Sequence, residues 1–190
     1  MKHLVRTLLA ATILALAPLA ASEAAGTIRV AVQKTGTFAW ELAVIRAHGL
    51  DKQADLAIEV TELASPEASK IALRAGNADM MVSDWLWVSR ERELGATLTF
   101  YPYSSALGAV MVQASSPIKS LADLKGRKLA VAGGPIDKSW LLLQALARRT
   151  GVDLRRQATI VYGAPPLLSE KQVQGETDAT LTYWNFCADL

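Results

Sequence analysis

The sequence predicts an α/β protein of two lobes, each a parallel sheet with helices, joined by a hinge. After residue 25, short runs rich in β-branched residues alternate with stretches of helical periodicity, a pattern typical of parallel sheets with crossover helices. The pattern changes once, over Tyr101–Gln113, where Pro102, Ser104 and Ser105 interrupt it. We therefore expect a first lobe over residues 26–103 and a second over residues 104–190.

Residues 1–25 have the three parts of a secretory signal peptide. Lys2 and Arg6 give a basic start, Leu8 to Leu19 form an apolar run, and small residues follow. The run is shorter than the roughly 20 residues that span a bilayer, and Pro18 interrupts it. The pattern therefore predicts export to the periplasm with a cleaved leader rather than a membrane anchor.

The first lobe is expected to contain four extended segments and three helices. Gly49 and Gly76 are placed to end the first two helices, and Ser65-Pro66 supplies an N-cap with proline at the first helical position. The expected strands are Thr27–Gln33, Leu56–Leu63, Asp79–Ser83 and Thr97–Tyr103, and the expected helices are Thr37–His48, Pro66–Ala75 and Trp85–Glu93.

The second lobe is expected to repeat this alternation. Ser120 and Asp123 have the spacing of a capping box before a short helix, and Gly133-Gly134-Pro135 predicts a tight loop between a strand and a helix. The expected strands are Ala106–Gln113, Lys128–Ala132, Thr159–Tyr162 and Asp178–Tyr183, and the expected helices are Lys138–Thr150 and Pro165–Gln174.

Composition excludes several classes of function. The formal net charge is +2, or +1 without the leader. Such a small net charge, scattered along the chain, does not indicate the basic surface that nucleic-acid binding requires. Cys187 is the only cysteine and His48 the only histidine beyond the leader. We therefore expect no metal site, no cofactor and no Ser-His-Asp or Cys-His catalytic group.

Candidate ligand contacts follow the carboxyl ends of the expected strands, where open α/β sheets bind ligands. All five tryptophans lie there, and they are either core aromatics or partly ligand-facing. Asp84 is either a helix cap or the partner of a ligand amine or hydroxyl, whereas Asp137 is interpreted as an N-cap. The candidates are Thr35, Gly36, Thr37, Trp40, Ser83, Asp84, Trp85, Gly133, Gly134, Lys138, Ser139, Trp140, Tyr162 and Trp184.

Two helix N-termini, near Thr37 and Lys138, are expected to face each other across the cleft. Their free N–H groups and the Lys138 charge favour an anion, and the tryptophans favour an organic one. A cation held by the same rings with Asp84 as counter-charge is the competing interpretation.

Four segments resemble the nitrate/sulfonate/taurine-type substrate-binding proteins of ABC importers. They are Ser120–Leu154 (SLADLKGRKLAVAGGPIDKSWLLLQALARRTGVDL), Gly175–Trp184 (GETDATLTYW), Val30–Val44 (VAVQKTGTFAWELAV) and Ala75–Val88 (AGNADMMVSDWLWV). The resemblance implies a type II periplasmic binding protein fold, a small ligand clamped between two lobes, and an inner-membrane ABC permease as partner of a monomeric protein. It also implies ligand contacts for Thr35, Gly36, Thr37, Ser83, Asp84, Gly133, Lys138 and Trp184.

Members of that family return to the first lobe after the strand that Asp178–Tyr183 resembles. We therefore expect this chain to be a C-terminally truncated member with an incomplete first lobe. Two alternatives stay open: an enzyme on the same fold that resembles thiamine-pyrimidine synthases, and a ligand-sensing protein that reports to a membrane receptor.

Overall fold

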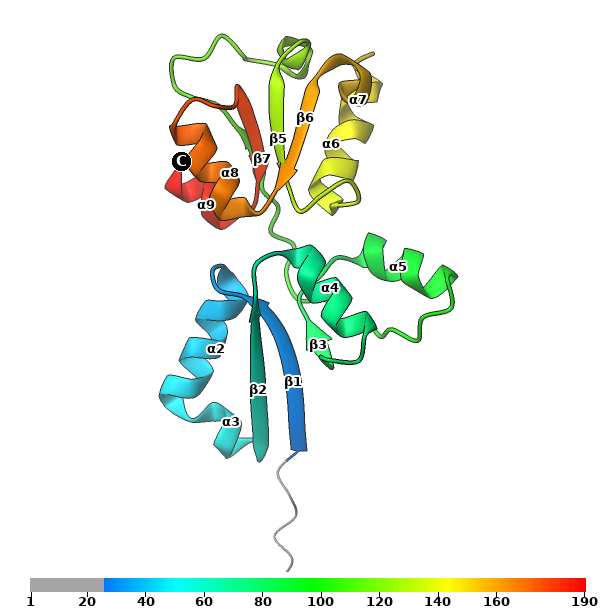
Figure 1. The fold of residues 1–190 in the computed structure, drawn as a ribbon, viewed down its shortest axis with the longest axis vertical. Coiled ribbons are helices and arrows are strands. Elements are labelled where there is room, and N and C mark those ends of the chain that lie inside the picture. Colours follow the sequence, from blue (N-terminus) through cyan, green and yellow to red (C-terminus); the bar gives the residue numbers. More distant parts are fainter. Residues whose placement is uncertain (1–25) are drawn as a thin grey trace, which may run out of the picture.

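Two sheets, one in each half of the chain, organise the computed structural model, which describes residues 26–190. The first lobe contains β1 to α5 and the second contains β4 to α9, and the two are stacked end to end (Figure 1). The expected α/β class with two lobes is confirmed. The expected signal peptide, residues 1–25, lies outside the described residues.

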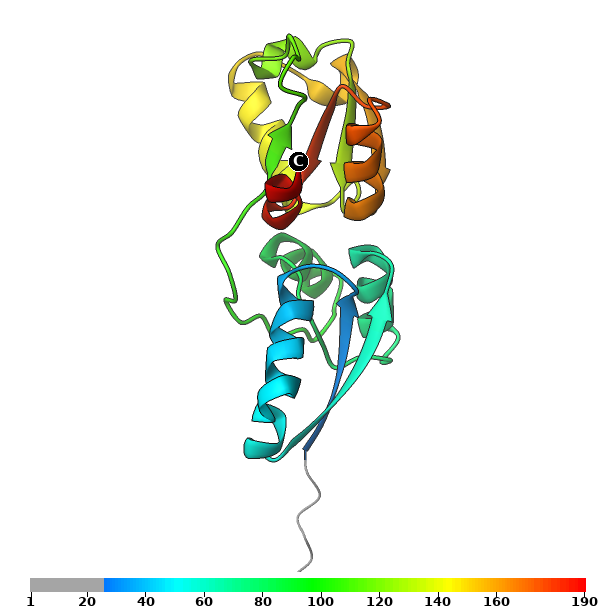
Figure 2. The ribbon, with the colours of Figure 1, turned by 90° about the vertical axis from the view of Figure 1, so that its left-hand side faces the viewer.

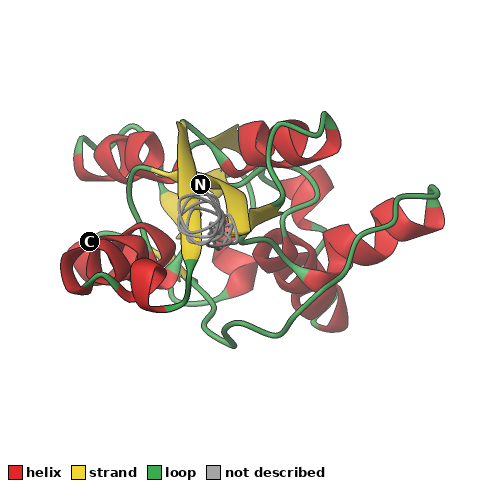
Figure 3. Ribbon diagram, turned by 90° about the horizontal axis from the view of Figure 1, so that it is seen from below, coloured by secondary structure: helices red, strands yellow, loops and turns green. Residues whose placement is uncertain are grey.

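The first lobe is a three-stranded parallel sheet of order β2-β1-β3. Its central strand buries Val30, Ala31 and Val32, and the first two helices lie on one side of the sheet (Figures 1 and 3). The bounds are β1 Gly26–Gln33, α2 Thr37–His48, α3 Leu50–Gln53, β2 Leu56–Leu63, α4 Pro66–Arg74, β3 Met80–Met81 and α5 Trp85–Glu93.

The second lobe is a four-stranded sheet of order β4-β7-β5-β6. Only β4 runs antiparallel to its neighbour, so the sheet is mixed rather than wholly parallel. The bounds are β4 Ala109–Met111, the 3₁₀-helix η2 Leu121–Leu124, β5 Lys128–Ala132, α6 Lys138–Arg149, α7 Leu154–Gln157, β6 Thr159–Gly163, α8 Pro165–Val173, β7 Ala179–Thr182 and α9 Trp184–Asp189.

Local chemistry explains where the helices begin and end. The Ser65 hydroxyl accepts a hydrogen bond from the Ala68 N–H at 3.2 Å, and Pro66 opens α4. Gly49 ends α2 in the left-handed conformation at φ 61°. The expected capping box also forms, since the Asp123 carboxylate accepts the Ser120 N–H at 2.8 Å.

One expected strand is wrong. Thr97–Tyr103 has no regular secondary structure and instead leads out of the first lobe, and Figure 2 shows this connection running along the outside toward β4. Pro102 cannot donate to a ladder, because it lacks an N–H group. The sequence interpretation also missed three short helices, α3, α7 and α9.

The hydrophobic core is unequally divided between the lobes. The largest buried cluster lies in the second lobe and includes Leu129, Val131 and Trp140. The first lobe has a cluster of only three buried residues within the described part of the chain, Val30, Val32 and Leu42, with partly buried neighbours around them. Because burial of apolar surface is the main source of stability, the second lobe is the better stabilised half.

Candidate functional site

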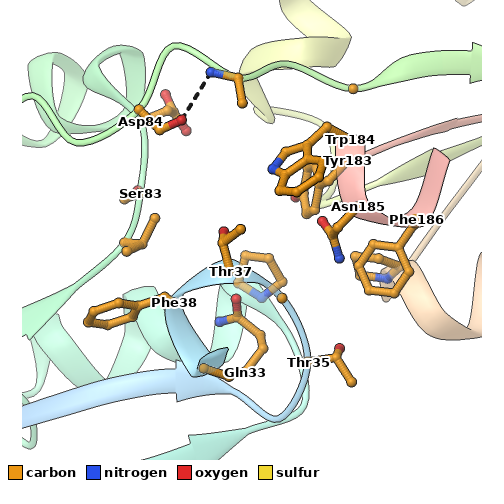
Figure 4. Close-up of a pocket in the computed structure, with 18 of the residues that line it drawn as sticks. Gln33, Thr35, Thr37, Phe38, Ser83, Asp84, Tyr183, Trp184, Asn185 and Phe186 are labelled. Atoms are coloured by element: carbon orange, nitrogen blue, oxygen red, sulfur yellow. Dashed lines mark hydrogen bonds between the residues drawn. The ribbon is translucent and has the colours of Figure 1, made fainter. Parts of the chain in front are cut away.

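A cavity of about 210 Å³ lies where the two lobes meet. The carboxyl ends of β1, β3, β5 and β7 all lead into its lining, as expected for a ligand site in open α/β sheets. Figure 4 shows around this space Thr37 from α2, Ser83 from the loop between β3 and α5, and Trp184 from α9. Side chains from both lobes therefore reach one chamber.

Eight of the fourteen residues proposed from the sequence line this cavity. They share positions at strand ends or helix starts, and they are Thr35, Gly36, Thr37, Ser83, Asp84, Lys138, Ser139 and Trp184.

Gly133 and Gly134 lie just behind the cavity lining. A Cβ on Gly133 would stand 2.5 Å from the Asp137 carboxylate and 2.3 Å from the Tyr183 hydroxyl. Both glycines have positive φ, 86° and 98°. Gly133 lets the backbone pass close to Asp137 and Tyr183, which line the cavity themselves, whereas a Cβ on Gly134 would stand 3.3 Å from the Glu67 carboxylate.

Four aromatic candidates, Trp40, Trp85, Trp140 and Tyr162, do not line the cavity. Trp140 is 0% exposed in the second-lobe core, and Tyr162 packs edge-to-face against it at 6.5 Å. Trp85 is 54% exposed outside the lining. Large aromatic side chains gain most by burial in a core, so a place at the sheet edge does not make them ligand contacts.

Trp40 and Trp184 instead form a contact between the lobes. Their ring centroids are 6.2 Å apart in an edge-to-face arrangement. Trp40 belongs to α2 of the first lobe, and Trp184 opens α9 of the second. Of the five tryptophans, Trp184 is the one that lines the cavity.

The two aspartates in the lining are bonded to helix N-termini. The Asp84 carboxylate accepts the Trp87 N–H at 2.9 Å and caps α5. Asp137 caps α6 by accepting the N–H groups of Ser139 and Trp140 at 2.8 and 3.3 Å. Both side chains are buried, and these hydrogen bonds compensate for the loss of water.

Asp137 also accepts the Tyr183 hydroxyl at 3.0 Å. Burial raises the pKa of Asp137, against the opposing effect of these hydrogen bonds, and burial beside Asp137 raises the pKa of Tyr183. Tyr183 therefore stays protonated and donates to the carboxylate at physiological pH.

Sequence reasoning missed Lys70 and Glu67, both on α4. Lys70 lines the cavity with its side chain about nine-tenths buried, and its Nζ lies 5.6 Å from the centroid of the Trp87 ring. The nearest carboxylate oxygen is Oε1 of Glu67, at 3.9 Å. A lysine midway along a helix carries no local motif, so only the folded arrangement reveals it.

No group of three metal-ligating side chains occurs among residues 26–190, and none of the helices there is long and apolar enough to cross a membrane.

Comparison with known proteins gives one family match. The model of the NMT1/THI5-like family matches residues 42–188. A search of curated protein sequences finds no significant match.

Solved structures share the fold. The periplasmic aliphatic sulphonate binding protein SsuA from Escherichia coli is 24% identical with a TM-score of 0.63, and the match covers 86% of this chain and 56% of that one. The alkanesulfonate-binding protein SsuA from Xanthomonas axonopodis pv. citri, bound to MOPS, is 21% identical with a TM-score of 0.64, with 83% and 54% covered. An arginine-bound variant of ArgBP from T. maritima is 14% identical with a TM-score of 0.59, with 86% and 76% covered. The chain thus spans little more than half of either sulfonate-binding protein.

Proposed function

This chain belongs to the NMT1/THI5-like family, and from that membership we propose that it is the solute-binding component of an ABC importer. It acts in the periplasm as a monomer, captures a small organic anion between its lobes, and delivers it to an inner-membrane permease. The observation that carries this proposal is the chamber between the lobes, into which strand ends and helix starts of both lobes lead.

The chamber suits binding better than a reaction. Its two lining aspartates are engaged by backbone N–H donors, and Tyr183 donates to one of them. A general acid or base must be free to exchange a proton with a substrate. These groups instead shape the chamber and hold the starts of α5 and α6.

An enzyme on the same fold is the second candidate function. The family includes synthases as well as binding proteins, which is the observation that favours it. The two candidates differ in the fate of the ligand: a binding protein returns it unchanged, whereas a synthase converts it.

A solute screen tests the proposal. The purified protein is titrated with alkanesulfonates, carboxylates, amines and sugars, while thermal unfolding and tryptophan fluorescence are followed. Because a ligand that binds only the folded state stabilises it, one solute class should raise the unfolding temperature. Closure should also alter emission through the Trp40–Trp184 contact.

Mass spectrometry of the recovered solute completes the test. Unchanged solute supports a binding protein, and a converted solute supports the enzyme. No stabilisation by any solute would refute the proposed function.

A further inference from the structure

Lys70 is a largely buried cation whose close partners among the described residues are the Glu67 carboxylate and the ring of Trp87. The residue is 8% exposed, and among the described residues no hydrogen-bond acceptor lies within bonding distance of its ammonium. The Glu67 oxygen at 3.9 Å is too distant for a hydrogen bond. Buried charge of this kind is costly unless a partner meets it, and the side that remains open to Lys70 is the chamber.

Lys70 and the start of α2 both line the chamber, and a hydrogen bond links the elements that carry them. The Gln33 side-chain amide at the end of β1 donates to the Ser69 hydroxyl at 2.8 Å, and Ser69 is fully buried. This bond ties α4, immediately beside Lys70, to the strand that leads into α2. Gly36 and Thr37 line the same chamber as Lys70.

The N-terminus of α2 is uncapped, unlike those of α4, α5 and α6. Gly36 stands at the N-cap with φ 110° and offers no side chain, whereas Ser65, Asp84 and Asp137 cap the other three helices. The first N–H groups of α2 are therefore free to bind a ligand. A free helix N-terminus carries partial positive charge and favours anions.

The chamber lining holds two carboxylates, Asp84 and Asp137, besides Lys70 and Lys138. Asp84 and Asp137 are satisfied by N–H donors, as described above. Burial raises the pKa of Glu67, and the charge of Lys70 opposes this effect. Lys138 is less buried than Lys70, so water screens its charge more strongly.

We propose that Lys70 and the uncapped first turn of α2 form the subsite for an oxyanion group of the ligand, a sulfonate or a carboxylate. Ser83 adds a hydroxyl to this subsite, because the residue lines the chamber and its buried Oγ has no hydrogen-bond partner among residues 26–190. This inference rests on the proposed solute-binding function and assigns the anion to the first lobe. Lys138, across the chamber, has the smaller role.

Titration with MOPS, ethanesulfonate and acetate tests the subsite, with binding to the full chain followed by calorimetry. The variant K70M keeps a long apolar stem beside Trp87 and removes the charge, and K70R keeps the charge. The matched control K138M makes the same change in the same chamber. K70M should weaken binding of the best anion about tenfold or more, as loss of a charge-assisted hydrogen bond predicts.

K70R should recover most of the affinity, and K138M should change it by less than about threefold. Thermal unfolding of the ligand-free variants checks the fold, and K70Q replaces K70M if the latter unfolds early. If K70M, or K70Q in its place, binds the anion as tightly as the wild type does, the proposed subsite is wrong. If the protein binds neutral or cationic solutes and none of the three anions, the oxyanion subsite is wrong, but the proposed solute-binding function stands. Binding of no solute at all refutes the proposed function together with the subsite.

Discussion

Replacing Asp137 separates a structural role from a ligand-binding role where the second lobe borders the chamber. Its carboxylate accepts the N–H groups of Ser139 and Trp140 and the hydroxyl of Tyr183. Loss of an N-cap costs about 1 kcal/mol, and loss of a hydrogen bond to a charged group costs about 1.5–3 kcal/mol. Relief of the buried charge offsets part of this cost. We therefore expect D137A to lower the free energy of unfolding by about 1–3 kcal/mol.

The variant D137N serves as the matched control. An asparagine oxygen still caps α6, and its amide can donate to the Tyr183 oxygen, so the loss should stay below about 1 kcal/mol. Urea unfolding followed by circular dichroism measures both variants. If D137A unfolds at the same urea concentration as the wild type, the capping argument is wrong. If D137N abolishes ligand binding without loss of stability, Asp137 is a ligand contact.

The same residue predicts a dependence on pH. Burial raises the pKa of Asp137 in the folded protein above the unfolded value of about 3.9. The neutral form is therefore favoured by folding, and its contribution to stability is complete below that unfolded value. The contribution is lost as pH rises through the folded pKa. D137N should remove this part of the pH dependence.

Three further predictions concern the frame of the molecule. A Cβ on Gly108 would stand 1.5 Å from the Thr182 carbonyl oxygen, so G108A should lower the urea midpoint, and an unchanged midpoint would contradict the close β4–β7 approach. Asp79 bonds Arg29, which lowers the Asp79 pKa to about 2, so its contribution to stability is present above the unfolded value of about 3.9 and is lost as pH falls toward 2. Acid unfolding should show this loss in the wild type and not in D79N; identical acid limbs would count against the pair. Hydrogen exchange measured by mass spectrometry should be slower in the second lobe than in the first, because the second lobe holds the larger buried cluster; equal protection would show that the first lobe is stabilised by something other than its small core.

Periodic and capping signals predicted most of the fold. Thr37–His48, Leu56–Leu63 and Lys128–Ala132 have the bounds that the sequence predicts, because apolar periodicity and a Gly stop act locally. The antiparallel direction of β4 was not predictable in the same way. Strand direction is decided by pairing with β7, about 70 residues along the chain, and no local pattern reports it.

The site was predictable where it depends on backbone position. Thr35, Gly36 and Thr37 follow a strand and open a helix, and the topology of parallel sheets brings such positions to one edge. The direction of the tryptophan side chains was harder to predict, because a side chain at that edge can point into the chamber or into a core. Trp140 points into the core and Trp184 lines the chamber, although both directly follow strand ends in the sequence.

The N-cap residue of each helix decides whether the start of that helix can bind an anion. An aspartate before a helix ties up the N–H groups that an anion would need, as Asp84 and Asp137 do at α5 and α6. A glycine at the same position leaves those groups free, as Gly36 does at α2. From the sequence, the N-termini of α2 and α6 were both expected to face the cleft and to favour an anion between the lobes. The difference in their caps favours α2 over α6 as the proposed anion site, and Lys70 lines the same chamber.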